Sequence, residues 1–488
     1  MDCQEVVPLG CLDGHEAWTL FAMKAGLNDS SDDAIQKLAK QIIKKCRGLS
    51  IAIVTLGSSL KGKSYHGWEA AYLRLKNHRL TEIEDVNEEN AYLCLEVSFD
   101  YLKNMETKLY FLLCSLFPED CEIYVEDLVR FAWGLELYKY TNSINEVRNE
   151  VLAAIEILKN SCLLLDCGEM HVKMHDLVRE VALWIASPGK VISFAIKSEV
   201  VETLLKDDRL KHYTGISFRS NQTRELPDGL VFPNLKVLLL GVYSGVEISG
   251  EFLQGMKALQ VCALGHGLIS PAAFQFQRKL RTLKLYACEL SDISMIGRLK
   301  SLEILSLHRS GIVELPNEIG DLENLRLLEL SNCENVRRIP PYLIGRLSNL
   351  EEVYLRNCRS IKWATGNSAT EEESYSSLSE LNSLPKLGVL SLDISCQHLP
   401  DGFVFRKLPS FDVCIGIHRG DRCKKRDFET CPISRCLRIE KSVDACKQLL
   451  EDVKSLELHN VVGHTNLVPS LDIGQGGFNK LNCLHLEG

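Results

Sequence analysis

The second half of the chain carries a recurring apolar pattern, Leu-x-x-Leu-x-Leu, with polar residues between the leucines. The full pattern occurs at 235–240, 280–285, 302–307, 325–330 and 387–392, and Cys262 or Val353 fills the middle slot at 259–264 and 350–355. From 235 to 350 the successive starts lie 24, 21, 22, 23 and 25 residues apart. Alternate residues of a short strand point to one side, so each repeat supplies leucines to a core that stacked neighbours complete. This spacing predicts a leucine-rich-repeat solenoid running from about Leu235 to the end of the chain.

A helical array is the main alternative for these repeats. Proline disfavours it, because Pro227, Pro316 and the pair Pro340-Pro341 punctuate the segments between repeats, where a helix interior could not accept them. Two further strands are predicted at 453–458 and 481–486. The chain stops directly after the last of these without a polar cap, so we expect a truncated solenoid.

The repeat pattern is interrupted twice. An insertion between Leu355 and Leu387 contains Gly366–Ser368 and the acidic run Glu371–Glu373. From Phe411 to about Cys446 the repeats degenerate around a basic cluster of Arg419, Arg422, Lys424, Lys425 and Arg426. We interpret these stretches as solvated loops, with a partner-contact patch as the alternative.

Three cysteines occupy one position of the repeat. Cys288, Cys333 and Cys358 each lie three residues after the last leucine of a predicted strand. A small buried side chain suits the turn out of the strand, so we predict core thiols without a redox role.

The first half of the chain is predicted to be mostly helical, and several of its helices begin after Asp or Ser as N-caps would. A short hairpin is predicted at 163–166 and 171–173, followed by an amphipathic helix whose apolar face includes Leu177, Val181 and Ile185. The expected helices are 16–24, 33–46, 68–76, 89–102, 106–113, 125–137 and 144–159.

Residues Gly57–Ser64 match the phosphate-loop pattern Gly-x-x-x-x-Gly-Lys-Ser letter for letter. A strand at Ile51–Leu56 followed by a helix would suit that reading. However, a phosphate loop lies at the edge of a parallel sheet, and here helices precede and follow with no other strand predicted for about 100 residues. Leu49, Ile53, Leu56 and Leu60 also fit helical spacing. We therefore interpret Gly57–Ser64 as a decoy.

Composition narrows the class of protein. The 488 residues are 45% apolar and 25% charged, which is typical of a globular protein of two or three domains. A net charge of −9 does not indicate the excess of positive charge that is typical of proteins that bind nucleic acid. No signal peptide and no membrane span are evident, and the 19 cysteines show no zinc-type spacing, so we expect a cytoplasmic protein without a metal site. No catalytic arrangement of side chains can be assembled from spacing, and we expect no enzyme activity beyond a vestigial ATPase module.

Four motifs in the first half make a family resemblance specific. Met174–Arg179 (Met-His-Asp-Leu-Val-Arg) resembles the MHD motif of plant nucleotide-binding leucine-rich-repeat immune receptors (NLRs). Cys114–Asp120 is similar to a block found in their coiled-coil class, Arg47–Ala52 to the Gly-Leu-Pro-Leu motif, and Glu16–Phe21 to the block just upstream of it. With the repeats, these motifs cover nearly the whole chain, and their order matches the family.

The resemblance implies a multidomain α and α/β fold. A helical ARC1 subdomain would occupy residues 1–87, a winged-helix ARC2 subdomain with the MHD motif 88–190, a linker and lead-in to the repeats 191–230, and the leucine-rich repeats 231–488. It also implies an ADP/ATP-controlled switch, in which His175 contacts the β-phosphate of ADP while Asp176 orients the loop and caps the following helix. The implied nucleotide-binding residues are Met174, His175, Asp176, Gly48, Leu49 and Ser50.

Two departures from the family limit this expectation. The chain begins after the position where the family's phosphate loop would lie, so we expect an N-terminally truncated protein with weak or no nucleotide binding of its own. Ser50 also stands where the family has proline.

The leading hypothesis is an intracellular plant immune receptor whose repeats sense a pathogen effector or a guarded host protein, or contact other NLR chains. The candidate partner-binding residues point outward from the strands: Lys284, Tyr286, Ser306, His308, Glu329, Ser331, Tyr354 and Arg356. One alternative is a truncated repeat scaffold that partners other receptors without nucleotide switching. The other is an NTPase that uses Gly57–Ser64.

Overall fold

The computed structural model describes residues 11–28, 31–77, 86–168, 170–187, 193–197, 211–219, 225–365, 374–416, 434–440, 444–459 and 480–487. The backbone divides into two compact units. Unit 1 comprises residues 1–129 and 145–194, and unit 2 comprises 130–144 and 195–488. The insertion residues Gly366–Ser368 and Glu371–Glu373 and the basic cluster at 419–426 lie outside the described residues.

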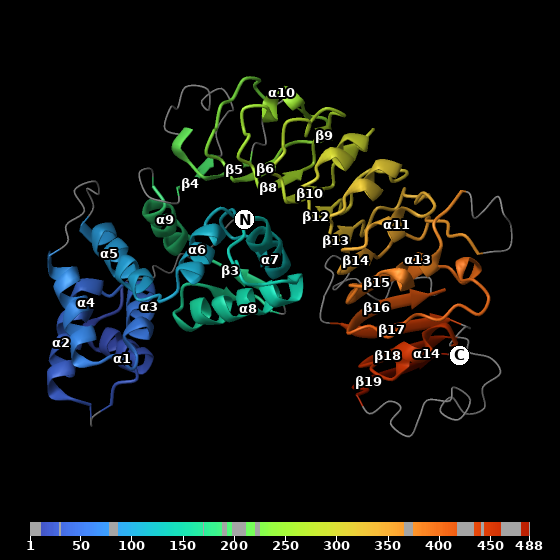
Figure 1. Ribbon diagram of the computed structural model, residues 1–488. Helices are drawn as coiled ribbons and strands as arrows, with labels where there is room; N and C mark the ends of the chain where they lie inside the picture. The colour runs from blue at the N-terminus through green and yellow to red at the C-terminus, as the bar shows by residue number, and fades with distance from the viewer. Residues whose placement is uncertain are drawn as a thin grey trace, which may run out of the picture. The chain divides into compact units, whose positions relative to one another are not determined.

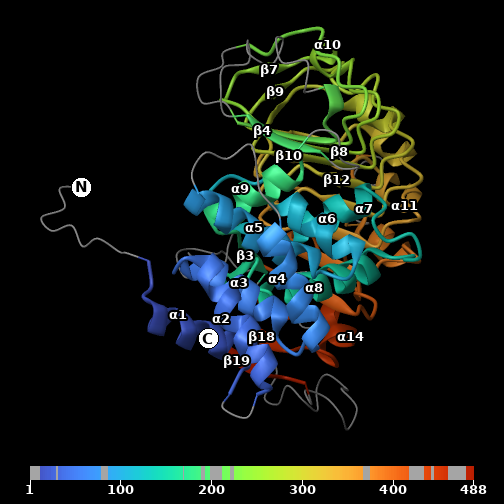
Figure 2. The same ribbon diagram turned by 90° about the vertical axis from the view of Figure 1, so that its left-hand side faces the viewer.

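Unit 1 is helical, as its sequence predicts. Its first helices are α1 (Gly14–Ala25), α2 (Asp33–Cys46), α3 (Ser50–Leu60), α4 (Tyr65–Asn77) and α5 (Val86–Asp100). These helices pack on one another (Figure 2). Their buried core includes Phe21, Ile42, Ile53 and Trp68. The segment between α2 and α4 forms the helix α3, so the helical reading of 49–60 is confirmed over the strand reading.

The rest of unit 1 is built from short strands and helices. They are α6 (Met105–Cys114), β1 (Ile123–Tyr124), α7 (Val125–Gly134), α8 (Ile144–Asn160), β2 (Leu165–Asp166), β3 (His171–Lys173) and α9 (Asp176–Ile185), and the final turns of α7 belong to unit 2. The predicted hairpin is confirmed as β2 and β3, which pair antiparallel. Strand β1 adds to the other side of β3 and was not predicted, since two residues carry too little pattern to detect.

A buried ion pair ties α7 to α8 within unit 1. Arg148 donates from Nε to Glu126 Oε1 at 2.7 Å and from Nη2 to Glu126 Oε2 at 2.9 Å. The two side chains are 0% and 1% exposed. Such a bidentate pair is among the stronger polar contacts in proteins, provided that both charges stay matched.

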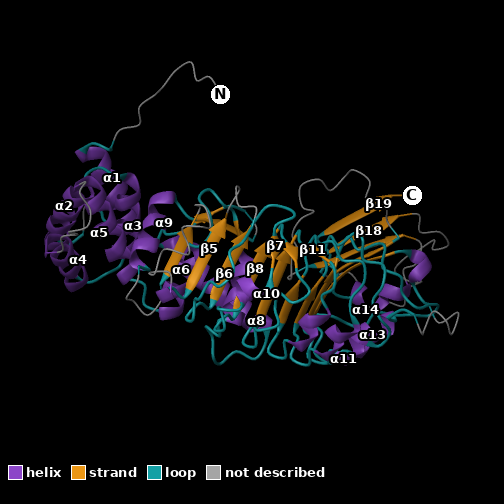
Figure 3. Ribbon diagram, turned by 90° about the horizontal axis from the view of Figure 1, so that it is seen from above, coloured by secondary structure: helices purple, strands orange, loops and turns teal. Residues whose placement is uncertain are grey.

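Unit 2 is a stack of repeats whose strands form one parallel sheet (Figures 1 and 3). The sheet runs from β4 (Phe194–Lys197) and β5 (Gly215–Arg219) through the predicted repeats to the last strand, β19 (Cys483–Glu487), so part of the predicted lead-in at 191–230 is already sheet. The strands between are β6 (Val237–Gly241), β8 (Val261–Gly265), β10 (Thr282–Tyr286), β12 (Ile304–Ser306), β13 (Leu327–Glu329), β14 (Glu352–Leu355), β15 (Val389–Ile394), β16 (Ser410–Ile415), β17 (Arg435–Glu440) and β18 (Ser455–His459).

The connecting segments carry the remaining elements. Strands β7 (Glu247–Ile248), β9 (Leu268–Ile269) and β11 (Glu289–Leu290) form a second parallel sheet. The short helices α10 (Gly250–Leu253), α11 (Leu343–Arg346), α13 (Leu378–Ser383) and α14 (Lys447–Leu450) and several 3-10 turns complete the repeats. The repeat leucines, such as Leu283, Leu305 and Leu328, are fully or almost fully buried in one continuous core.

Two expectations about the interruptions need correction or refinement. The repeats do not degenerate after Phe411, because β16 and β17 continue the sheet in register. Phe411, Val413 and Ile415 replace the leucines there, so the apolar alternation persists although the template fails. The insertion before Leu387 does not interrupt the sheet either, since β14 pairs directly with β15.

The three slot cysteines are core residues, as predicted. Cys288, Cys333 and Cys358 are about 1% exposed or less. Their thiols donate to backbone carbonyls of the preceding repeat, Cys333 to Leu307 O at 2.8 Å and Cys358 to Leu330 O at 2.9 Å. Burial raises the pKa of the Cys333 thiol to about 12, so the thiol stays protonated and unreactive at neutral pH.

Candidate functional site

The eight predicted partner-binding residues form two rows on the strand face of the repeats. Strand pairing places Lys284, Ser306, Glu329 and Tyr354 side by side, one per repeat. The second row, two residues further along each strand or just beyond it, holds Tyr286, His308, Ser331 and Arg356. Lys284, Tyr286 and Arg356 are half-buried, whereas Ser306, His308, Glu329, Ser331 and Tyr354 are buried. Their role as partner contacts stays a prediction, but five of them do not form an open surface.

Part of this burial comes from residues 130–144, which we call the docked segment. Arg130 donates from Nη1 to Glu329 Oε2 at 2.7 Å, and both side chains are 3% exposed. Ser306 Oγ donates to the same carboxylate at 2.6 Å. Burial alone would raise the pKa of Glu329, but Arg130, His308 and Ser306 together hold that pKa well below its ordinary value. The carboxylate therefore remains charged and paired.

Trp133 anchors the docked segment on a row of alternating charges, the charge row, made of Arg281, Glu303, Arg326 and Glu351. Each stands immediately before a strand of the sheet. Trp133 Nε1 donates to Glu303 Oε2 at 2.7 Å, and the Arg326 guanidinium lies 4.9 Å from the centre of the indole ring. The guanidinium over the face of the indole and the hydrogen bond from its N–H together fix the position and the orientation of the ring.

The members of the charge row form ion pairs with one another and also contact the docked segment. Arg281 Nη2 lies 2.9 Å from Glu303 Oε1, and Arg326 bridges Glu303 and Glu351. At the end of the docked segment the Ile144 amide donates to Glu351 Oε2 at 2.8 Å. Burial raises the pKa of Glu303 in spite of its neighbour Arg281.

Apolar contact completes the docking. Val261, Ile304 and Leu327 stand in one row of the strand face and are fully buried. Gly134 lies directly on this row, since a Cβ there would meet Thr282 Oγ1 and Val261 Cγ2 at 2.6 Å. Thr282 Oγ1 also donates to the Arg130 carbonyl at 2.9 Å. The sequence did not predict this docking, because the contacts join residues 127 to 207 positions apart. The local signal was that the strand positions 261, 304 and 327, which point away from the repeat core, are apolar.

Further along the sheet, Arg356 takes part in a separate ion-pair cluster. Its Nη1 lies 2.7 Å from Asp412 Oδ2, and Arg438 pairs with the other oxygen of that carboxylate. The three side chains are 13%, 9% and 17% exposed, so this cluster is a partly accessible charged area of the strand face.

The Met174–Asp176 motif of unit 1 connects β3 to α9. Met174 is buried, whereas His175 and Asp176 are exposed. The N-cap of α9 is His175, whose Nδ1 accepts from the Leu177 amide at 3.2 Å, so the expected capping role of Asp176 is wrong. Asp176 instead lies in the first helical turn, where a negative charge is favourable.

The end of the same motif contacts the Cys114–Asp120 block. Arg179 donates from Nε to the Phe117 carbonyl at 2.7 Å and from Nη1 to Glu119 at 3.0 Å. Lys173, just before the motif, pairs with Asp120. Two motifs about 60 residues apart in the chain therefore form one contact in unit 1.

The Gly48–Ser50 turn lies between α2 and α3. Gly48 has φ +77°, and a Cβ at this position would lie 2.3 Å from the Leu12 carbonyl oxygen. Its own carbonyl accepts from the Leu12 amide at 2.9 Å. Leu49 is the N-cap of α3 and Ser50 begins the helix, with its side chain exposed. Helices α3 and α9, which follow the two candidate nucleotide motifs, both pack on α5.

The phosphate-loop pattern Gly57–Ser64 does not form a loop after a strand. Its first four residues belong to α3, and Gly57 packs against Phe21 and Lys24. Lys63 lies over the Tyr101 ring at 5.0 Å from the ring centre. The interpretation as a decoy is confirmed, because a phosphate cradle needs free backbone amides after a strand.

We predict that Lys63→Ala leaves the affinity of the full chain for ADP and ATP unchanged. The ammonium stacks on Tyr101 and faces no ring of backbone amides, so no phosphate contact is lost. Isothermal titration of wild type and variant with each nucleotide checks this. A selective loss of affinity in the variant, with the thermal midpoint preserved, would revive the NTPase alternative.

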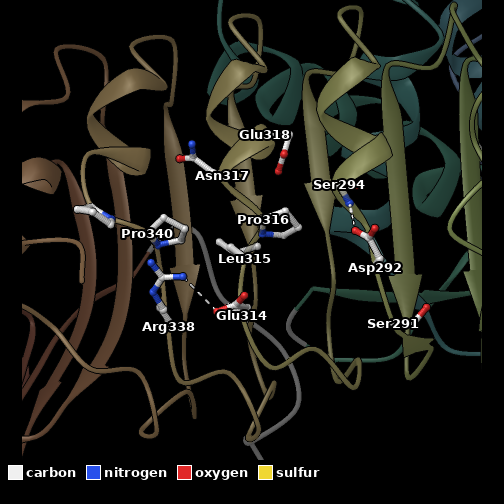
Figure 4. A pocket seen from close by; sticks show the side chains of 11 residues that line it. Ser291, Asp292, Ser294, Glu314, Leu315, Pro316, Asn317, Glu318, Arg338 and Pro340 are labelled. Carbon is white, nitrogen blue, oxygen red and sulfur yellow. Dashed lines mark hydrogen bonds and ion pairs between the residues drawn. The ribbon is translucent and has the colours of Figure 1, made fainter. Parts of the chain in front are cut away.

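An open groove of about 690 Å³ lies on the connecting segments of three consecutive repeats (Figure 4). Asp292, Glu314 and Glu318 line it together with Arg338, which pairs with Glu314 at 3.3 Å, and with three prolines. None of the eight predicted partner residues lines this groove.

Two general features bear on the kinds of site that the chain offers. In the described part of the chain, no helix combines the length and apolar character needed to cross a bilayer. Within the same residues, His, Cys, Asp and Glu side chains form no group of three or more able to hold a metal ion.

Comparison with known proteins places both units in one family. Disease resistance protein At4g27190 from Arabidopsis thaliana is 28% identical over 502 aligned positions, which cover 99% of this chain and 49% of the relative. Disease resistance protein UNI from the same plant is 31% identical over 66% of this chain and 40% of the relative. The chain spans about half the length of these relatives or less. None of the protein-family models matches it.

Among solved structures, a leucine-rich-repeat protein of Leptospira interrogans superposes with a TM-score of 0.32 and 16% identity, over 60% of this chain and 81% of that protein. The repeat architecture itself follows from the parallel strands and the buried leucines described above. Probable disease resistance protein At1g51480 of Arabidopsis thaliana is 33% identical over 67% of this chain. Because such relatives align through the helical unit and the repeats alike, the chain belongs to the family of plant disease resistance proteins of the NLR type.

Proposed function

We propose that this chain is the regulatory and sensing part of a plant immune receptor that acts in the cytoplasm. The observation that carries the proposal is the single alignment with a disease resistance protein over 99% of the chain, through the helical unit and the repeats. The parallel repeats offer a binding surface for a protein partner rather than a site for covalent chemistry. The partner would be a pathogen effector, a guarded host protein or another receptor chain.

Within this proposal, residues 1–87 act as the ARC1 subdomain and 88–190 as the winged-helix ARC2 subdomain of a nucleotide-controlled switch. The exposed His175 at the start of the ten-residue helix α9 supports a phosphate contact there, because a helix N-terminus favours anions. The Gly48 turn before α3, where the backbone has no room for a Cβ, supports a second contact. With these residues alone, ADP or ATP would bind weakly.

Under this proposal, the docked segment limits which of the predicted partner residues can meet a ligand. It occupies the strand face between β8 and β14, so the half-buried Lys284, Tyr286 and Arg356 are the predicted partner residues best able to meet a ligand. A partner that needs Glu329 or Ser306 would have to displace the docked segment.

Gene disruption followed by challenge with a panel of pathogen isolates tests the immune role. We expect increased susceptibility to at least one isolate, restored by the wild-type gene. Unchanged resistance across a panel that the parent plant recognises would contradict the proposal.

The alternative is a repeat scaffold without nucleotide switching, which the docked segment favours because it stabilises the strand face without any ligand. His175→Ala separates the two functions in a cell-death assay. A switch predicts an altered response, whereas a scaffold predicts none. Asp32→Ala is the matched control, because Asp32 caps α2 by a hydrogen bond of its side chain to the Ala34 amide at 2.8 Å, so it reports the loss of a helix cap alone.

A further inference from the structure

A chain of four hydrogen-bonded side chains crosses the strand face from the turn after β14 to Glu329. Asn357 Nδ2 donates to Asn332 Oδ1 at 2.7 Å. Asn332 Nδ2 lies 3.3 Å from His308 Nε2, and His308 Nδ1 lies 3.4 Å from Glu329 Oε1. We call these four residues the relay. It ends on the carboxylate that binds Arg130 of the docked segment.

While His308 is neutral, its partners fix the direction of the relay and the tautomer of the imidazole, because the ionised Glu329 carboxylate only accepts. The oxygen of Asn332 accepts from Asn357, so its nitrogen must be the atom that faces His308. An amide nitrogen only donates, and His308 Nε2 must therefore accept. The proton of the neutral imidazole then lies on Nδ1 and points to Glu329.

The backbone favours short polar side chains at the two relay turns. Asn332 and Asn357 have φ of 62° and 54°, in the left-handed region that asparagine tolerates better than most residues. Both side chains are thereby held at equivalent positions of neighbouring repeats, within reach of each other.

Charged and titratable groups face His308 from every element packed on it. Glu329 lies on β13, and Arg130 approaches the same carboxylate from the docked segment. The Tyr286 ring of β10 stacks on the imidazole at 5.6 Å and 14°, Lys284 shares that strand, and Arg309 adjoins His308 in sequence and donates to the Tyr286 hydroxyl. His308 is 8% exposed, so its charge is poorly screened by water.

We propose that His308 is a pH-sensitive switch that controls how firmly the docked segment is held on the repeats. A proton added at Nε2 converts that atom from an acceptor into a donor. The contact with Asn332 Nδ2 is then lost unless the amide of Asn332 rotates by half a turn. That rotation sets two amide nitrogens against each other at Asn357, which must rotate in turn. The two bonds through Asn332 therefore reverse, while His308 Nδ1 still donates to Glu329.

Protonation also adds a second cation beside Glu329. The imidazolium and the Arg130 guanidinium then share one carboxylate and repel each other. Acidification therefore weakens the attachment of Arg130, and by linkage the presence of Arg130 disfavours the proton on His308. Glu329 itself remains ionised while an imidazole titrates, because its own pKa is held low.

Nuclear magnetic resonance of the full chain with labelled histidine tests the coupling. Arg130→Ala is expected to increase the protonated fraction of His308 at a given mildly acidic pH, because a neighbouring positive charge is removed. Asn332→Ala is expected to increase that fraction as well, since the neutral imidazole loses its donor. A protonated fraction of His308 that neither variant changes would overturn the proposal.

Hydrogen exchange of residues 130–144 tests the consequence at about pH 5.5 and about pH 7.5, after correction for intrinsic exchange. Protection in the wild type is expected to fall at the lower pH, and in His308→Gln it is expected to be equal at both. His266→Gln is the matched control, because His266 is exposed and contacts the edge of the same Tyr286 ring, and it should behave as wild type. An acid-induced loss of protection that persists in His308→Gln would also sink the proposal.

Discussion

Arg148→Ala is expected to lower the free energy of unfolding of unit 1 by about 3–5 kcal/mol, the range for breaking a buried ion pair from one side. The substitution leaves the Glu126 carboxylate 1% exposed without its two charged hydrogen bonds. Denaturant unfolding, monitored by hydrogen exchange of the amides in α7 and α8, measures the loss.

Arg74→Ala is the matched control for Arg148→Ala. Arg74 bridges Asp100 at 3.1 Å with side chains 48% and 42% exposed, so we expect a loss within about 1 kcal/mol. A second variant, Arg148→Met with Glu126→Leu, removes both charges and is expected to recover most of the loss. If Arg148→Ala and Arg74→Ala lowered the free energy of unfolding equally, the buried pair would contribute no more to stability than the exposed one.

Glu329→Ala is expected to release the docked segment and to lower the free energy of unfolding of unit 2 by about 3–5 kcal/mol. The variant leaves Arg130 charged and 3% exposed, and it removes the acceptor of Ser306. Since the pKa of Glu329 is lowered, its stabilisation is fully present above the unfolded pKa of an ordinary Glu and disappears only as the pH falls through the depressed value.

The effect of Glu329→Ala is measured by hydrogen exchange at residues 130–144 together with the thermal midpoint. Glu314→Ala serves as the control, because its partner Arg338 lies 3.3 Å away with both side chains well exposed. Unchanged protection of residues 130–144 in Glu329→Ala would mean that Trp133 and Gly134 hold the segment without the ion pair.

The leucine spacing was sufficient to predict the repeats and the positions of most of their strands, because burial selects one side-chain type at a fixed period. It failed for β16 and β17, where Phe411, Val413, Ile415 and Ile439 do the same packing without matching the template. Helices were predicted to within a few residues from their caps and periodicity. Helical spacing also identified α3, although its glycine and serines imitate a phosphate loop.

The candidate site was harder to predict than the fold. Strand alternation identified which residues point away from the core, and Lys284, Ser306, Glu329 and Tyr354 do share one row. It could not predict that Arg130 and Trp133 pack on that face, since pairing over such distances leaves no local pattern. The motif at Met174–Asp176 was found by resemblance, yet only the backbone shows that His175, rather than Asp176, caps α9.

The charge row also limits how the number of repeats can change. Its members alternate in sign, with Arg281, Glu303, Arg326 and Glu351 one repeat apart. Loss of residues 303–325 would bring Arg281 beside Arg326, two like charges separated by a strand spacing of about 4.8 Å. Loss of residues 303–350 would bring Arg281 beside Glu351 and restore an attractive pair. In this part of the molecule, a gene rearrangement that removes two repeats therefore keeps the alternation of charge, whereas one that removes a single repeat breaks it.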